Sequence, residues 1–377
     1  MTGEGLAFSF EGQASHNEAT GLSLNGAGKL EADDLDPWLA IAGVGLPGMG
    51  FGLPVNLAVD IDIDDGLLVL SGLHGTAADS SLNGDINARL RDGVPHLTGA
   101  LALADFDLAP VAEMIIGAPA LVAQNQSWPD APFATEASPP FTAELDLAVD
   151  HLAAGTFAKA QDAQLTLRLE RDGFSLNNLH ASVFDGAIDG FVEFRNDRGA
   201  GFLSGQISLD QANLRQLIGN AGLSGQASLT ASATASGKSV SSMVASLAGS
   251  GAAKLHDLSI SGLAPQAFAL LLAQADTFGP QISMEAVSGF APELVQDGIF
   301  KSAENVEFAF TLANGTLRVP PLRLETQGAA LSGEARADLS EGLVAADVML
   351  TYDAGKEALA GSEPSVRFSL TGPRDAP

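Results

Sequence analysis

Two glycine-rich strings have the residue types of phosphate-binding motifs. Residues 43–48 (GVGLPG) match the GxGxxG pattern of dinucleotide sites, and residues 237–239 (GKS) resemble the end of a P-loop. A dinucleotide site needs a strand before the glycines and a helix after them, so that the pyrophosphate meets the helix N-terminus. Residues 43–48 instead follow a predicted helical turn, and Ser232 occupies the first glycine position of the P-loop. We therefore interpret residues 43–48 as a flexible loop and predict no nucleotide site.

The candidate metal ligands also lack the spacing of a metal site. Asp60, Asp62 and Asp64 have the first spacings of a calcium loop, but Asp65 stands at its invariant glycine and Ser71 at its terminal glutamate. The six histidines show no HxH or HxxxH pairing, and the chain has no Cys and no GxSxG nucleophile elbow. We interpret the three Asp as a solvated strand face. The sequence predicts a protein that is not an enzyme and that holds no metal or cofactor.

The elements that carry these residues have a period of two. Apolar side chains alternate with polar ones over residues 56–64, 141–150, 165–170, 306–312 and 366–371. Such alternation predicts strands with one apolar and one polar face. Asn-Gly and Asp-Gly pairs, which favour the tight turns between antiparallel strands, occur at residues 25–26, 65–66, 83–84, 92–93, 172–173, 185–186, 297–298 and 314–315. The chain is therefore predicted to be a mainly β antiparallel meander.

Helical patterns are few and short. A Pro at the first helical position, or apolar spacing of three and four residues, predicts helices at residues 36–39, 105–116, 210–218, 239–247 and 265–275. Five prolines in the segment 119–140 predict a loop or linker. We predict an N-terminal β-rich segment of a curled sheet at 1–118, this linker at 119–140, and a C-terminal β-rich region at 141–377.

The composition excludes several classes of partner. The 377 residues are 46% hydrophobic, and 18 Lys plus Arg stand against 46 Asp plus Glu, for a formal net charge of −28. This hydrophobic content rules out general disorder. The acidity argues against nucleic acid, because phosphate binding requires Lys and Arg, and it disfavours wide contact with anionic headgroups. The lack of Cys fits an oxidising compartment.

Each apolar strand face must be covered. The alternation predicts some 16–20 strands, and open sheets of that width usually curl, close or split. A second sheet, helices, or a curled sheet that holds something apolar could each cover the apolar face. The helices are too few to do so. Periodicity alone leaves a sandwich and an apolar groove as alternatives.

Targeting segments are missing from this sequence. No stretch reaches the ~18 apolar residues that span a bilayer, and residues 1–13 have neither the basic nor the apolar region of a signal peptide. The N-terminus opens within a predicted strand. We therefore expect this sequence to be a piece of a longer protein, or one without its targeting segment.

The C-terminal half contains three sequence motifs in a characteristic order. A Trp-Pro-Asp-x-Pro entry lies at residues 128–132, a strand pair ending in L-x-A-x-x-F-x-G-x-x-x-G lies at 179–190, and G-x-S … L-x-G-x-G lies at 237–251. In this order the motifs resemble the C-terminal region of the AsmA-like proteins of Gram-negative envelopes. The resemblance covers residues 127–272, while the flanking regions share only the alternating pattern. The motifs describe strand reversals and a capped short helix, so they bear on fold rather than catalysis.

The resemblance implies a fold and a function. AsmA-like proteins are similar to bridge-like lipid transfer proteins, in which a long, curled (taco-like) antiparallel sheet carries an apolar concave face and a few short helices. The resemblance also implies a periplasmic location and an inner-membrane tether through a segment absent from this chain. It further implies possible envelope protein partners, and phospholipid movement between the inner and outer membranes.

Two functions are therefore expected from the sequence. In the first, inward residues bind phospholipid acyl chains, and the groove-lining candidates are Leu145, Leu147, Leu165, Leu167, Leu169, Val306, Phe308, Phe310 and Phe368. The binding would be driven by apolar burial, at ~25 cal/mol per Å². In the second, the same residues form a closed core of a structural β-scaffold that binds a protein partner. An enzyme remains a third, weaker hypothesis.

Overall fold

The computed structural model describes residues 2–3, 5–17, 21–123, 127–136, 139–156, 158–219, 222–278, 298–353, 355 and 363–373. The fold is mainly β, with 65% strand and 12% helix. Its sheet is not closed into a barrel, which agrees with a curled, open sheet and confirms the predicted fold class. The chain divides into two compact units. Unit 1 comprises Met1–Val183, Ile188–Gln206 and Thr234–Met243, and unit 2 comprises Phe184–Ala187, Ile207–Ala233 and Val244–Pro377.

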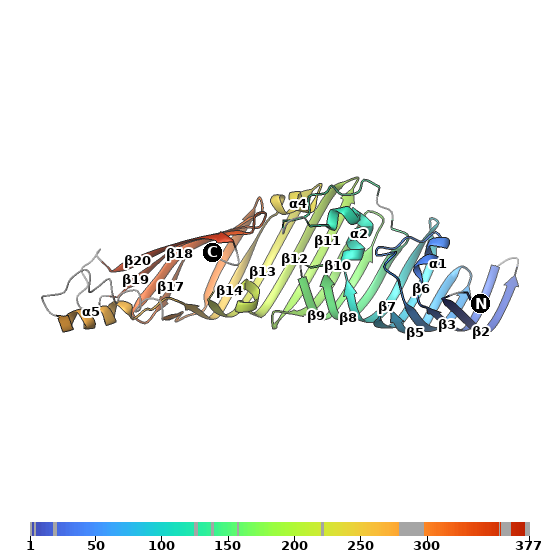
Figure 1. Ribbon diagram of the computed structural model, residues 1–377, viewed down its shortest axis with the longest axis horizontal. Helices are drawn as coiled ribbons and strands as arrows, with labels where there is room; N and C mark the ends of the chain where they lie inside the picture. The colour runs from blue at the N-terminus through green and yellow to red at the C-terminus, as the bar shows by residue number, and fades with distance from the viewer. Residues whose placement is uncertain are drawn as a thin grey trace. The chain divides into compact units, whose positions relative to one another are not determined.

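Unit 1 is built on strands β1 to β10, which pair in the order of the chain. Their bounds are β1 Thr2–Gly3, β2 Leu6–Asn17, β3 Gly21–Ala32, β4 Val55–Asp64, β5 Leu67–Ala77, β6 Ser80–Arg91, β7 Val94–Asp107, β8 Thr142–Ala154, β9 Ala158–Leu169 and β10 Gly173–Val183. In Figure 1 these strands run side by side from blue to green. Helix α1, Asp36–Ile41, lies between β3 and β4 in the chain.

One strand pair departs from the predicted antiparallel meander. Strands β7 and β8 are parallel, with His96 opposite Thr142 and Asp107 opposite Ala153. A parallel pair needs a crossover connection, because the chain must return to the end from which it started. Helix α2, Ala109–Ile116, the 3-10 helix η1, Ala118–Leu121, and the Pro-rich segment supply that connection. The prolines of 119–140 thus lie between two neighbouring strands of unit 1.

Unit 2 contains strands β14 to β20. Their bounds are β14 Ala248–Ser261, β15 Ile299–Lys301, β16 Val306–Ala313, β17 Thr316–Thr326, β18 Ala329–Asp338, β19 Leu343–Tyr352 and β20 Ser365–Pro373. Strand β14 pairs with both β15 and β16, and the antiparallel pairing then continues in chain order from β16 to β20. The strands β11 Gly186–Asp197, β12 Ala200–Asn213 and β13 Leu223–Gly237 contribute residues to both units.

The remaining helices are α3 Leu214–Ile218, α4 Val240–Ser246 and α5 Ala267–Phe278. All five predicted helices exist, but α2 and α3 begin four residues later than the apolar spacing indicates. Residues 105–107 belong to β7, and residues 210–213 belong to β12. In both places strand pairing continues to the residue next to the helix, so the local pattern is overridden by the sheet.

Two of the predicted turns are wrong. Gly26 and Gly84 lie inside β3 and β6, where they pair with Gly12 and Leu101 respectively. Gly84 has a φ of 144°, and a Cβ there would overlap the backbone carbonyl oxygen of Ala100. This glycine therefore permits close approach of a neighbouring strand rather than a chain reversal. The pair at 297–298 lies partly outside the described residues.

Bulges keep the apolar side chains on one face where the sequence alternation is interrupted. Between Val319 and Leu322, strand β17 has one residue more than its partner β18, and the extra length falls at Pro320 and Pro321. A bulge of this kind restores the facing of the residues that follow it. Proline is tolerated there because the ladder hydrogen bond is already interrupted. Similar register shifts occur in β5, next to Gly72, and in β10.

A strap, defined as residues 127–136, packs against the sheet of unit 1. The Phe133 amide donates to the Lys238 carbonyl over 2.8 Å, and the Ser241 amide donates to the Pro129 carbonyl over 2.9 Å. The buried Asn196 side chain donates to the carbonyls of Ile115 and Ala134. These hydrogen bonds attach the strap and the end of α2 to strand β11, to helix α4 and to Lys238 just before that helix. They hold the Trp-Pro-Asp-x-Pro motif, residues 128–132, in place on unit 1.

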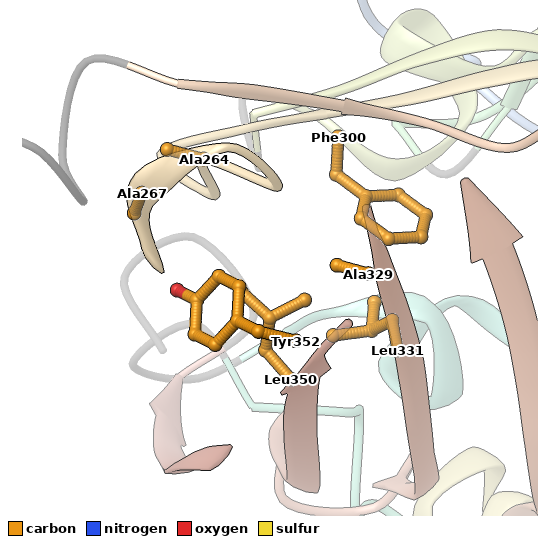
Figure 2. Packing of buried hydrophobic residues seen from close by; sticks show 7 residues of the cluster. All are labelled: Ala264, Ala267, Phe300, Ala329, Leu331, Leu350 and Tyr352. Carbon is orange, nitrogen blue, oxygen red and sulfur yellow. The ribbon is translucent and has the colours of Figure 1, made fainter. Parts of the chain in front are cut away.

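An apolar cluster holds α5 against unit 2. Figure 2 shows its buried members, which are Ala264, Ala267, Phe300, Ala329, Leu331, Leu350 and Tyr352. The ring of Tyr352 stacks on Phe268 at a centroid distance of 6.0 Å. Burial raises the pKa of the Tyr352 hydroxyl, which has no hydrogen-bond partner among the described residues. The cluster covers the end of the apolar sheet face that lies nearest to α5.

Candidate functional site: the apolar sheet face

Rows of apolar side chains cross the strands of unit 1. Residues that pair directly across neighbouring strands lie side by side on one face of the sheet. One row consists of Ala14, Leu24, Ile63, Leu68, Ala88, Leu97, Ala143, Leu169 and Phe174. The next consists of Gly12, Gly26, Ile61, Leu70, Ile86, Gly99, Leu145, Leu167 and Leu176. Neither row contains a polar side chain, so this face is continuously apolar from β2 to β10.

The opposite face of unit 1 carries polar side chains. The row that alternates with the two apolar rows consists of Gln13, Asn25, Asp62, Val69, Asn87, Thr98, Glu144, Arg168 and Ser175. Within it Asn25 donates to Asp62 over 2.6 Å, and Arg168 donates to Glu144 over 2.9 Å. The Glu144 carboxylate raises the pKa of Arg168 through this hydrogen bond and through its charge. Charge and apolarity are thus separated between the two faces.

The predicted residues of unit 1 lie together on the apolar face of β8 and β9. Leu145 pairs with Leu167, and Leu147 pairs with Leu165. Leu169 lies one row further along. All of these except the half-buried Leu145 are buried. The strap contributes to covering this face, since the ring of Phe133 packs on Phe194 and Phe194 packs on Phe174.

Unit 2 also carries apolar side chains on one face and polar side chains on the other. We call the apolar rows of its strands β17 to β20 the lattice. Its apolar face carries three successive rows, namely Leu324, Leu331, Leu350 and Val366; Leu322, Gly333, Val348 and Phe368; and Val319, Ala335, Ala346 and Leu370. Outward rows include Arg323 with Ser332, Met349 and Arg367, and Glu334 with Asp347 and Ser369. With strands ~4.8 Å apart, the apolar lattice extends over about 15 Å across four strands.

The lattice of unit 2 is less covered than β8 and β9 in unit 1. Val366 and Leu370 on β20 remain 37% and 46% exposed, and Phe368 between them is half-buried. Leu331 and Leu350 are buried members of the cluster that holds α5, and Phe368 packs against it. The uncovered apolar surface of the lattice therefore lies at Val366 and Leu370 on β20.

The other predicted residues of unit 2 lie along β16. Val306, Phe308 and Phe310 pair with Leu255, Ala253 and Gly251 of β14. Val306 is buried in a cluster with Leu214, Ala227 and Leu258, and Phe308 packs against the same cluster. The ring of Phe310 covers Gly251, because a Cβ on that glycine would overlap the ring. The absence of a side chain at Gly251 thus leaves the space that the phenyl ring of Phe310 occupies.

Sequence reasoning missed most of the unit 2 lattice. Its members on β17, β18 and β19 include Leu322, Leu324, Leu331, Val348 and Leu350. Alternation was readable in each segment, but Pro320 and Pro321 interrupt it and small residues dilute it. Counting the two prolines as a bulge would have restored the pattern.

Hollows on the polar face have a different chemistry. One of about 530 Å³ lies over β6 to β9 and is lined by Asn83, Asp85, Asp146, Gln164, Thr166 and their neighbours. The Thr166 hydroxyl donates to Asp146 over 2.7 Å. A second hollow, of about 580 Å³, includes Lys254, whose ammonium lies 2.6 Å from the Glu307 carboxylate. The carboxylate and hydroxyl groups in both linings distinguish these hollows from the rows of the apolar face.

Within the described ranges, no three His, Asp or Glu side chains are grouped so that they could hold a metal ion. Nor does any helix in the described part of the chain combine the length and apolar character needed to cross a bilayer.

No family model, no curated protein and no solved structure matches this sequence.

Proposed function

We propose that the protein binds phospholipid acyl chains on its apolar sheet face and moves phospholipid between the inner and outer membranes of a Gram-negative envelope. The protein would work in the periplasm, tethered to the inner membrane by a segment outside this sequence, and without catalysis. The observation that carries the proposal is the unbroken succession of apolar rows opposite polar rows in both units. The AsmA-like phrases of the C-terminal half favour the same function.

The chemistry of the face fits acyl chains. A hydrocarbon chain offers no hydrogen bonds, so a surface that binds it needs no polar partners and gains free energy with the apolar area removed from water. Aromatic residues amount to only 6% of the sequence, and most rows consist of aliphatic side chains and glycine. Such a surface would discriminate little between lipids. The polar face remains available to water.

A structural scaffold is the second candidate, and one observation favours it. The apolar face at β8 and β9 is buried by the chain's own residues, with Leu147 4% exposed and Leu165 4% exposed. This is what a closed core would look like. An Asp at Leu167, also buried, would destabilise the fold under either function, so it cannot separate them. The half-covered lattice of unit 2 is the better place to test.

The test compares two neighbouring residues of β19 that lie on opposite faces. Val348→Asp puts a carboxylate on the apolar lattice, between Gly333 and Phe368, whereas Met349→Asp puts it on the outward row beside Ser332 and Arg367. Native mass spectrometry of protein purified without detergent, and after incubation with phospholipid vesicles, measures bound lipid. We expect bound lipid for the wild type and for Met349→Asp, and loss of it for Val348→Asp.

Circular dichroism and denaturant unfolding accompany each sample. A Val348→Asp protein that stays folded but no longer holds lipid supports the groove. If Val348→Asp unfolds while the wild type carries no lipid, the face is a closed core and the scaffold replaces the transfer proposal. A wild type that neither purifies with lipid nor takes it up from vesicles contradicts transfer whatever the variants do.

A further inference from the structure

The connection between β3 and β4 exposes large apolar side chains in a small region. We define the apolar loop as α1 and the residues that follow it, 36–53. Phe51 is 95% exposed, Ile41 is 80% exposed and Trp38 is 37% exposed. Trp38 and Ile41 are three residues apart on α1 and therefore lie on the same side of the helix. Single exposed apolar residues are ordinary, but three large ones within a span of this length indicate an interaction site.

The loop is held in place by two carboxylates. Asp36, itself buried, accepts hydrogen bonds from the amides of Gly50 and Gly52 at 2.8 and 3.3 Å. Asp34 accepts from the amide of Leu53 at 3.0 Å. Because Phe51 lies between the two glycines bound by Asp36, its backbone is fixed next to the first turn of α1. The phenyl ring is therefore presented to solvent by a braced loop.

The size of the loop argues against a protein partner. A stable protein interface buries about 800 Å² on each partner, whereas an aromatic side chain contributes about 150–250 Å². The three exposed side chains fall short of that area. Shallow insertion into a bilayer needs no matching surface, and its strength grows with the apolar area inserted. Tryptophan in particular is enriched at the membrane interface.

The charge around the loop selects the kind of bilayer. Residues 30–88 contain no Lys or Arg, and the exposed Glu31 and Asp33 precede the loop. Anionic headgroups attract basic segments and would be repelled by these acids. We propose that the apolar loop inserts Trp38, Ile41 and Phe51 into the interface of a zwitterionic phospholipid bilayer. This goes beyond the proposed function, because a scaffold without a lipid groove could use the same loop.

The experiment uses the intrinsic tryptophan of the loop. The sequence has two Trp, so Trp128→Phe leaves Trp38 as the only one. This protein is titrated with phosphatidylcholine vesicles, with and without bromine on the acyl chains, and with vesicles containing added phosphatidylglycerol. We expect Trp38 emission to shift to shorter wavelength, to be quenched by the brominated chains, and to respond less when phosphatidylglycerol is present.

A variant and a matched control complete the test. Phe51→Ser should lower the affinity for phosphatidylcholine vesicles about tenfold, because burial of one large apolar side chain is lost. Leu90→Ser removes a side chain that is 67% exposed at the β6–β7 hairpin and should leave the affinity unchanged. Unaltered Trp38 emission with saturating vesicles, or equal binding by Phe51→Ser and wild type, would overturn the inference.

Vesicle binding by the apolar loop can be distinguished from lipid binding in the groove. Bound lipid is measured on protein in solution, where the loop takes no part, so Phe51→Ser should retain the lipid content of the wild type. Lipid-loaded protein that does not bind vesicles contradicts the loop alone. Vesicle binding by a protein that never carries lipid contradicts the groove alone.

Discussion

A single residue, Gly201 on β12, controls how the strap packs on the sheet. A Cβ at this position would lie 2.5 Å from Cε2 of Phe133 and 3.1 Å from Sδ of Met243. Phe133 is buried and contacts Phe194, so its ring cannot move aside without losing that edge-to-face packing. The absence of a side chain at Gly201 is therefore what allows the strap to lie on the sheet.

Gly201→Ala should lower the free energy of unfolding by about 1–3 kcal/mol, because one methyl group overpacks a filled site. Chemical denaturation measures the change, and limited proteolysis should show earlier cleavage within residues 127–136. Gly45→Ala is the control, since a Cβ there has nothing within 4 Å. Equal stability of Gly201→Ala and the wild type would mean that the strap is not anchored through Phe133.

At the scale of elements, the parallel pairing of β7 with β8 joins residues that are distant in the sequence. His96 on β7 lies beside Thr142 on β8, with Nδ1 2.9 Å from the threonine hydroxyl oxygen. Burial lowers the pKa of His96 below its usual value of 6.5, and the Arg91 cation lowers it further, against an opposing effect of Glu144. The neutral imidazole is therefore favoured in the folded protein.

This shift predicts how stability depends on pH. Below pH 6.5 the unfolded chain binds a proton at His96 more readily than the folded chain, so stability should fall as the pH decreases through that value and level off below the folded pKa. Urea unfolding between pH 5 and 8 should show a weaker decline for His96→Gln than for the wild type. His151→Gln, at an exposed position of the same strand pair, serves as the control. An identical decline in His96→Gln and wild type would exclude a role for this histidine.

At the scale of the whole molecule, the net charge of −28 is carried by a chain whose paired strands separate polar from apolar side chains. The outward acids of both units, such as Asp62 and Asp347, keep the polar face hydrated and repel other copies. The apolar rows would otherwise favour association between molecules.

The net charge predicts that the solubility of the protein depends on pH. Near the isoelectric point of about 4.2 the repulsion disappears, and the exposed apolar residues of β20 should then drive association. Light scattering should therefore rise steeply as the pH is lowered from 7 towards 4.2, and fall again once the pH returns to 7. Val366→Ser combined with Leu370→Ser should reduce the rise. Light scattering that does not change with pH would show that the net charge is not what keeps the protein in solution.

The local sequence was sufficient for the strands and for the facing of their side chains. Alternation at 141–150 and 306–312 predicts which residues share a face, because successive side chains of a strand point to opposite sides of the sheet. The pairs of Leu145 with Leu167 and of Leu147 with Leu165 agree with that expectation. Bulges were harder to predict, since one extra residue, as at Pro320 and Pro321, is indistinguishable from the end of a strand without its partner.

How far each apolar residue is covered could not be predicted from the sequence and is visible in the folded protein. Leu167 and Val366 both belong to alternating strands, yet the first is buried and the second is exposed at the edge of the described sheet. Coverage depends on segments distant in the chain, such as the strap and α5, and on the parallel crossover between β7 and β8. A sheet with one polar and one apolar face follows from the sequence alone, because the side to which a strand residue points is a local property of the backbone. The extent of its uncovered apolar surface is a property of long-range packing.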